Sequence, residues 1–237
     1  NQDSMNKGRG NGTMKHTKQM SESIRLGIIL AMSGGFMDAY SYIERDHVFA
    51  NAQTGNILLF GVHLSQGEFK LALSYFFPVF AFMLGIALAE YVRSKNIEIL
   101  HWRQLSVLIE AVILLGVSFF PLTLNLPANA LTSFACGIQV ESFRKIRGNG
   151  IATTMCIGNM RTATQNMFHF FHKKDREYLK KALLYYGIIC CFVIGAILGN
   201  IFCQHFQEKA ILCCSVLLFV AFIFMFVDYE REIEEMG

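Results

Sequence analysis

The sequence predicts an all-α integral membrane protein. In this fold class six transmembrane helices form an inverted 3+3 repeat, and two polar segments are re-entrant or break a helix. Three observations predict it: the composition, the lengths of the apolar segments, and a polar pattern that occurs twice. Of the 237 residues, 53% are hydrophobic and only 16% are charged, and the mean hydropathy is +0.38. Such a composition excludes a soluble globular domain and a disordered chain.

Six apolar segments are long enough to cross a bilayer, which takes about 20 residues with a broad range. We place them near 24–43, 71–92, 104–121, 127–143, 180–203 and 210–228. Two further apolar stretches, 48–64 and 151–171, follow the first and fourth spans. The first of them is marginal in length and rich in Asn, Gln, Thr and Gly, which favours a re-entrant segment over a crossing. Residues 24–228 thus form one membrane domain between a disordered cytoplasmic tail (1–23) and a short acidic cytoplasmic tail (229–237).

The distribution of positive charge predicts the orientation. With six crossings and a cytoplasmic N-terminus, all of the 21 lysine and arginine residues except Arg45, Lys70 and Lys209 fall on the cytoplasmic side. This asymmetry agrees with the positive-inside rule and places both termini inside. A full crossing by 48–64 would move the basic loop near 92–103 outside, which agrees less well.

A polar pattern occurs twice, 103 residues apart, within the apolar sequence. The first copy contains Gly34, Asp38, Tyr40, Ala50, Gly55 and Asn56, and the second contains Gly137, Glu141, Phe143, Thr153, Gly158 and Asn159. Phe82, Gly85, Leu88 and Ala89 likewise match Phe192, Gly195, Leu198 and Gly199. Because each half (about 24–121 and 127–228) has three spans, the second copy enters the membrane inverted, as in many transporters.

Carboxylates within membrane spans are costly and usually functional. Asp38 and Glu141 lie well inside spans one and four, and we expect them to bind a proton, a cation or a solute. The alternative is that each carboxylate caps a re-entrant helix or pairs with an arginine such as Arg45 or Arg144. Glu110 could add a third carboxylate and Gln139 an amide. Small residues also allow another helix to pack closely, and they recur at Gly27, Ala31 and Gly35. Gly195 and Gly199 form a second such set, which would serve either dimerisation or packing within one subunit.

Each copy also contains a polar break at which a helix could begin inside the membrane. The first break holds Asn51, Gln53, Thr54, Gly55 and Asn56, and the second holds Thr154, Gly158 and Asn159. A half-helix that starts there would direct its free N–H groups inward, and its polar side chains could replace water around a solute. The alternative is that these side chains hold helices together. Arg161 is a candidate counter-ion for Glu141 or for an anionic solute, or it extends to the interface.

The run Gly35-Phe36-Met37-Asp38-Ala39-Tyr40-Ser41-Tyr42, followed by Val48 to Asn56, resembles the YoaK-like family of small bacterial inner-membrane proteins, a family of unknown function. Gly137-Ile138-Gln139 and Thr153-Thr154 also resemble elements of that family. Ile157 departs from it, because a threonine is expected before the glycine. The resemblance implies a six-helix architecture and a bacterial inner-membrane location, and it implies no activity.

These patterns predict a small-solute transporter or channel whose substrate the sequence does not name. Proton coupling is open, because burial favours the neutral form of a carboxyl group. The alternatives are a membrane-embedded enzyme acting on lipid head groups, with the same carboxylates as acid and base, or a non-catalytic assembly or sensor subunit. The sequence contains no nucleotide-binding, hydrolase or metalloprotease motif. We therefore expect no catalytic residues, metal, cofactor or nucleic-acid partner; a homodimer stays open.

Overall fold

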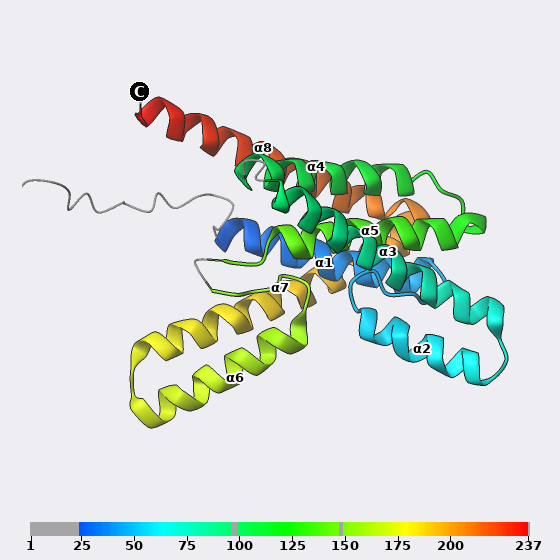
Figure 1. The fold of residues 1–237 in the computed structure, drawn as a ribbon, viewed down its shortest axis with the longest axis horizontal. Helices are drawn as coiled ribbons and strands as arrows, with labels where there is room; N and C mark the ends of the chain where they lie inside the picture. The colour runs from blue at the N-terminus through cyan, green and yellow to red at the C-terminus, as the bar shows by residue number, and fades with distance from the viewer. Residues whose placement is uncertain (1–23, 96–98, 147–148, 237) are drawn as a thin grey trace, which may run out of the picture.

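The computed structural model describes residues 24–95, 99–146 and 149–236, of which 99–101 and 226–236 are described by their backbone alone. Every regular element in these ranges is a helix (Figure 1). The α-helices are α1 (Ile24–Glu44), α2 (Gln53–Ser65), α3 (Phe69–Ser94), α4 (Ile99–Val117), α5 (Asn125–Ser142), α6 (Cys156–Lys173), α7 (Arg176–Phe206) and α8 (Ile211–Met236). Short 3-10 turns, η2 (Leu122–Leu124) and η3 (Gln207–Lys209), precede α5 and α8.

The helices coincide with the apolar segments of the sequence. The predicted spans correspond to α1, α3, α4, α5, α7 and α8, and the two extra stretches correspond to α2 and α6. Among the described residues three helical segments are long and apolar enough to cross a membrane, namely Ile24–Glu44, Phe69–Ser94 and Arg176–Lys209, and Ile211–Met225 is a shorter apolar helix. A count of six crossings stays a prediction. The predicted tail 1–23 lies outside the described residues. The predicted acidic tail, 229–237, continues α8 as a helix as far as Met236.

The helices pack in pairs that join the two halves of the chain. The most extensive contacts are those of α1 with α7 and of α3 with α5. In each half a hairpin follows, α2 against α3 and α6 against α7, and the two hairpins lie at opposite ends of the bundle (Figure 1). The last helices of the two halves, α4 and α8, pack against each other. The central part of the molecule is therefore built from α1 and α5, each covered by helices of the other half.

Glycine residues permit the closest of these helix crossings. A Cβ atom on Gly35 would overlap the carbonyl oxygen of Phe192, and one on Gly195 would overlap that of Met32, so α1 and α7 are in backbone contact. In the same way, a Cβ atom on Gly137 of α5 would overlap a backbone carbonyl of α3. Gly195 therefore serves packing within one subunit, and the close helix approach predicted for the small residues of α1 is confirmed at Gly35.

The outer surface of the bundle is strongly apolar. Large hydrophobic side chains are exposed along α3 and α7, among them Phe76, Phe77, Phe80, Met83, Leu84, Val193, Ile194, Ile197 and Ile201. The buried set contains many polar side chains instead, including Asp38, Arg45, Asn51, Asn56, Glu110, Asn129, Gln139 and Asn159. Exposed apolar area on this scale is not sustained in water by a monomeric protein. The distribution is that of a protein surrounded by lipid, with its polar groups inside.

Two helices begin inside the bundle and not at its surface. The loop after α1 turns back, and the backbone N–H of Asn51 reaches Asp38, which lies six residues before the end of α1. At 1.5 Å per residue the loop therefore returns by about 9 Å along α1 before α2 starts. Helix α2 has 13 residues and is about 20 Å long, too short for a hydrocarbon core of about 30 Å.

Candidate functional site in the centre of the bundle

Asp38 connects α1 to the start of α2. The side chain is buried, and its Oδ1 accepts hydrogen bonds from the backbone N–H of Asn51 (2.6 Å) and of Ala52 (3.4 Å). These N–H groups lie immediately before the first residue of α2, where the helix dipole is positive. The structure therefore contains the alternative predicted for Asp38, in which the carboxylate caps the start of a half-helix. The Asp38 carboxylate, and not a bound anion, thus accepts the free N–H groups at this end of α2.

The side chains of the first break hold the loop in place. Asn51 donates from Nδ2 to the carbonyl oxygen of Gly34 (3.2 Å). Gln53 donates to the carbonyl oxygen of Ala50 (2.7 Å) and to Ser133 Oγ on α5 (3.4 Å). The loop between α1 and α2 therefore contacts both α1 and α5.

Asn56, in the first turn of α2, holds the same loop through hydrogen bonds. Its Oδ1 accepts from the N–H of Phe49 (3.0 Å), and its Nδ2 donates to the carbonyl oxygen of Phe49 (2.8 Å) and to Gln53 Oε1 (2.9 Å). Gly55 packs against the ring of Phe49, because a Cβ atom there would lie 2.8 Å from two ring carbons. Thr54 is exposed. Asn56 and Gly55 thus shape the break, and Thr54 does not face the interior.

The second break repeats this arrangement 103 residues later. Asn159 is buried in the first turn of α6, and its Nδ2 donates to the carbonyl oxygen of Ala152 (2.7 Å), seven residues earlier, as Asn56 does to Phe49. Gly158 differs from Gly55, because nothing lies within 4 Å of a Cβ atom placed on it. The two asparagines of the repeated pattern therefore have the same structural role: each bonds the loop that precedes its own helix, and neither joins one helix to another.

Both loops reach the same place on α1. Asn51 of the first loop bonds to Gly34, and Thr154 of the second loop packs its side chain against the Cα of Gly34. Asn51 Oδ1 and Thr154 Oγ1 are buried and have no hydrogen-bond partner among the described residues. An unpaired buried polar atom costs about 1–3 kcal/mol. Asn51 and Thr154 thus each contact Gly34 through one group and carry a second, unpaired polar atom that a polar solute, an ion or water could satisfy.

Glu110 forms the second acidic part of the centre. With the Gln139 amide nitrogen facing the carboxylate, this nitrogen lies 2.6 Å and 2.8 Å from the two Glu110 oxygens, and the amide oxygen accepts from Thr153 Oγ1 (3.2 Å). This orientation is assigned from the hydrogen-bond network. Glu110 on α4 is thereby linked through α5 to the loop before α6. The predicted additions of a third carboxylate and an amide are brought together.

Cys136 on α5 contacts α1 beside Asp38. Its buried Sγ lies 3.7 Å from Sδ of Met37, the residue that precedes Asp38. We call Asp38, Asn51, Glu110, Gln139, Thr153 and Thr154 the central polar site. Cys136 and Ser133 lie beside this site on α5. The sequence does not identify them as site residues, because small residues in apolar segments are common packing residues.

Glu141 lies apart from this network of contacts. Its carboxylate pairs with Arg144, three residues on, and lies 3.8 Å from Arg93 on α3; Arg144 also pairs with Glu90 (2.9 Å). The alternative predicted for Glu141, pairing with an arginine, is the one that the structure contains. Arg161 is exposed on α6 and is not the arginine that pairs with Glu141.

Arg45 is buried, yet it does not pair with Asp38. Its guanidinium donates to Tyr40 Oη (2.9 Å), to the carbonyl oxygens of Phe120 (2.7 Å) and Pro121 (3.1 Å), and to Asn125 Oδ1 (3.0 Å). It therefore satisfies the free carbonyl groups after the end of α4. The role of Arg45 is to join the first half of the chain to the turn between α4 and α5.

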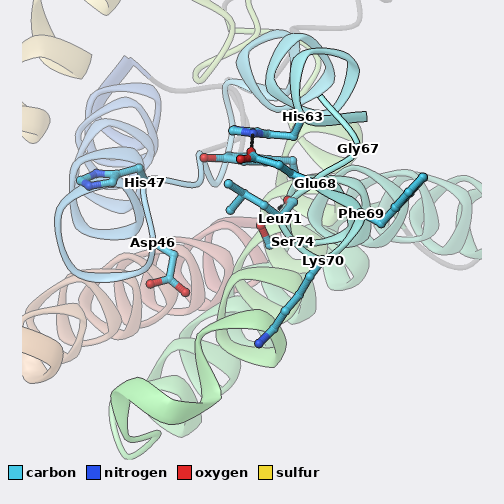
Figure 2. A pocket seen from close by; sticks show the side chains of 10 residues that line it. Asp46, His47, His63, Gly67, Glu68, Phe69, Lys70, Leu71 and Ser74 are labelled. Atoms are coloured by element: carbon cyan, nitrogen blue, oxygen red, sulfur yellow. Dashed lines mark hydrogen bonds and ion pairs between the residues drawn. The ribbon is translucent and has the colours of Figure 1, made fainter. Parts of the chain in front are cut away.

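A separate cleft of about 1010 Å³ lies between the α1–α2 loop and the α2–α3 hairpin. Figure 2 shows His63 and Glu68 facing each other in it, with His63 Nδ1 2.6 Å from Glu68 Oε2. The His63 ring also stacks on Tyr75, with 5.5 Å between ring centroids. Sequence reasoning missed this pair, because the two residues belong to different helix ends. Among the described residues, no group of three or more His, Cys, Asp and Glu side chains could hold a metal ion.

Comparisons with known proteins give a family without an activity. The model of a family described as "Protein of unknown function (DUF1275)" matches residues 26–224. The UPF0700 transmembrane protein YoaK of Bacillus subtilis (strain 168) is 24% identical over 203 residues, which cover 81% of this chain and 88% of that protein. No solved structure matches the chain.

Proposed function

The chain belongs to the DUF1275 family of unknown function, and we propose that it is a small-solute transporter or channel of the bacterial cell membrane. One observation carries the proposal. Two loops that turn back into the bundle meet at Gly34. The first is bonded to the buried acid Asp38 and the second, through Gln139, to the buried acid Glu110, and each loop carries one unpaired buried polar atom. Non-helical backbone at membrane depth is tolerated where it is buried in protein or lines a water-filled path.

The proposed architecture is an inverted repeat with six crossings. Exchanging the halves turns the α1–α7 contact into the α5–α3 contact, and it turns the α2–α3 hairpin into the α6–α7 hairpin. The α4–α8 contact is converted into itself. These exchanges, and the equal spacing of the two breaks, support a two-fold axis in the membrane plane. In this arrangement both termini lie in the cytoplasm.

The chemistry of the site favours a solute that carries a positive charge or a hydrogen-bond donor. The unpaired atoms are an amide oxygen, on Asn51, and a hydroxyl oxygen, on Thr154. The acids nearby are Asp38 and Glu110. A proton, a small cation or a solute with N–H groups would satisfy these acceptors in place of its hydration shell. The first break offers no anion site, because Asp38 already occupies the start of α2.

Each acid has a distinct proposed role. Asp38 is bonded to the loop before α2, so neutralising or binding this carboxylate would change the hold on that loop. Glu110 is bonded through Gln139 to the loop before α6. A solute that competes for either carboxylate would therefore act on one of the two half-helices. This coupling of binding to loop position is what a transporter requires for alternating access.

A thermal-shift screen tests the proposal. Purified protein in neutral detergent is melted with a panel of monovalent and divalent cations, amino acids, polyamines, sugars and carboxylates, in parallel with Asp38→Asn and the control Lys70→Gln. The proposal predicts that at least one cation or amine stabilises wild type and Lys70→Gln but not Asp38→Asn. Stabilisation that is equal in all three forms, or confined to carboxylates, would contradict it.

The same preparations separate the other candidate functions. Turnover of a lipid head group in detergent, where no gradient exists, would indicate a membrane enzyme. A structural or sensor subunit predicts neither turnover nor flux in liposomes. Transport predicts flux of the stabilising solute into liposomes that contain wild-type protein.

A further inference from the structure

The tips of the two hairpins differ sharply in charge. The tip of the α6–α7 hairpin, residues 173–181, carries five cationic side chains and two carboxylates. The tip of the α2–α3 hairpin, residues 63–71, carries one lysine, one glutamate and one histidine, and its glutamate already pairs with the histidine (Figure 2). The hairpins occupy corresponding places in the two halves, so their packing alone does not explain this difference.

The α6–α7 tip forms a cleft of about 480 Å³ with two kinds of lining. Three cationic side chains, from Lys174, Arg176 and Lys180, line it together with three apolar ones, from Phe170, Leu179 and Leu183. This combination matches an amphiphile with an anionic head group and a hydrocarbon chain. Free phosphate would gain nothing from the apolar part of the lining.

The acids at this tip leave the positive charge largely available. Asp175 caps α7 by accepting from the backbone N–H of Glu177 (2.9 Å). Glu177 lies 2.7 Å from Lys180 Nζ, but both side chains are about two-thirds exposed (67% and 71%). Exposed ion pairs of this kind are worth little in water. The cleft therefore keeps a positive field that an anionic head group would meet.

Lys174 occupies a position that normally favours glycine. It ends α6 in the left-handed conformation, with φ of 55°. Helix ends of this geometry usually carry glycine, which adopts positive φ without steric cost. The Lys174 Nζ lies 6.0 Å from the centre of the Phe171 ring, at the edge of the cleft. A lysine here costs backbone stability and contributes a charge.

Large apolar side chains surround the cationic tip. Phe168, Phe171 and Leu183 are 57%, 60% and 57% exposed. Aromatic side chains with neighbouring lysines are typical of the membrane–water interface. The tip is therefore suited to lie at the head-group level, with the cleft facing lipid phosphates.

We propose that the cleft between the end of α6 and the start of α7 binds an anionic phospholipid, with the head-group phosphate at Lys174, Arg176 and Lys180 and an acyl chain along Phe170, Leu179 and Leu183. Basic pockets at the cytoplasmic ends of membrane helices are known to hold such head groups. The site does not depend on the proposed transport function, since it rests on the hairpin tip and not on the central polar site.

Native mass spectrometry of the full chain in neutral detergent tests the site, with phosphatidylglycerol and phosphatidylcholine as probes. Each cationic side chain near a membrane surface contributes about 1 kcal/mol, or about fivefold in affinity. The triple variant Lys174→Gln, Arg176→Gln, Lys180→Gln should therefore lose about a hundredfold in phosphatidylglycerol affinity, with little change for phosphatidylcholine. The control Lys70→Gln, at the tip of the other hairpin, should bind like wild type.

Lys174→Gly keeps the test decisive if the triple variant folds poorly. Glycine suits the left-handed conformation, so this variant should melt no earlier than wild type while it loses about fivefold in phosphatidylglycerol affinity. Equal binding of the two lipids, or wild-type affinity in either variant, would overturn the proposal. Displacement of phosphatidylglycerol by millimolar inorganic phosphate would also overturn it, because the site would then bind a free anion.

Discussion

Replacing Asp38 by asparagine and by alanine should give two clearly different stabilities. The carboxylate Oδ1 accepts two buried N–H groups, from Asn51 at 2.6 Å and from Ala52 at 3.4 Å. Asparagine keeps an oxygen at this position and loses the charge. Hydrogen bonds to charged groups are worth about 1.5–3 kcal/mol, and neutral ones about 0.5–1.5 kcal/mol, so we expect Asp38→Asn to cost about 1–2 kcal/mol.

Alanine removes the acceptor entirely. A buried donor left without a partner costs about 1–3 kcal/mol. The bond from Ala52 is long, so the total for Asp38→Ala should be about 2–4 kcal/mol. The loop before α2 should also become more mobile, because the contact to α1 through Asp38 is lost. The difference between the two variants, about 1.5 kcal/mol between the midpoints of these ranges, isolates the acceptor from the charge.

The assay is unfolding of the purified protein by titration with sodium dodecyl sulfate in mixed micelles. Asp46→Asn, an exposed acid in the same loop, serves as the control and should unfold like wild type. Equal stabilities for Asp38→Asn and Asp38→Ala would show that the Asp38 oxygen does not hold the loop before α2.

Five further variants test the helix packing and the contacts of Arg45, and the same unfolding titration measures each of them. Gly195→Ala should destabilise by about 1–3 kcal/mol or more, because its methyl group would overlap a backbone carbonyl of α1; Gly187→Ala on the same helix has open space and should be neutral or stabilising by up to about 1 kcal/mol. Gly55→Ala should cost more than Gly158→Ala, although the two positions are equivalent in the repeat, and equal costs would contradict the difference in their surroundings. Arg45→Leu should cost about 1–3 kcal/mol, because the part-buried carbonyl groups of Phe120 and Pro121 lose a charged donor; wild-type stability would exclude that role.

The positions of the helices could be predicted from the sequence because they depend on local patterns. Apolar length locates the long helices, and polar side chains beside glycine locate the two breaks, where α2 and α6 begin at Gln53 and Cys156. The same spacing of 103 residues separates these two starts as separates the repeated motifs. Close packing at Gly35 and Gly195 also follows from residue size, since only glycine admits a backbone at that distance.

The composition of the central polar site could be predicted only in part. Sequence position gives the depth of an acid along a helix and not the face on which it lies. Glu141 lies within one turn of Arg144 and pairs with it, so its match to Asp38 in the repeat did not bring it to the centre. Glu110 reaches the centre because α4 packs against α5, where Gln139 meets it. Such contacts between distant segments are set by tertiary packing.

The buried state of Arg45 has a similar origin. In the sequence this arginine is one of three cations on the side opposite to the rest, which suggests an exposed loop residue. In the structure it is fully buried and serves the end of α4, more than 70 residues away. A long-range hydrogen-bond acceptor of this kind leaves no local signal.

The central claim, that a solute passes through the polar centre next to Asp38, is tested most directly by flux. Wild-type protein, Asp38→Asn and Lys70→Gln are reconstituted in liposomes, and uptake of radiolabelled monovalent cations, amino acids and polyamines is measured with and without a pH gradient. We expect wild type and Lys70→Gln to take up at least one cation or amine above the level of protein-free liposomes, and Asp38→Asn to lose this uptake. Uptake by Asp38→Asn at the wild-type rate, or no uptake of any of these solutes by wild type, would contradict the central claim.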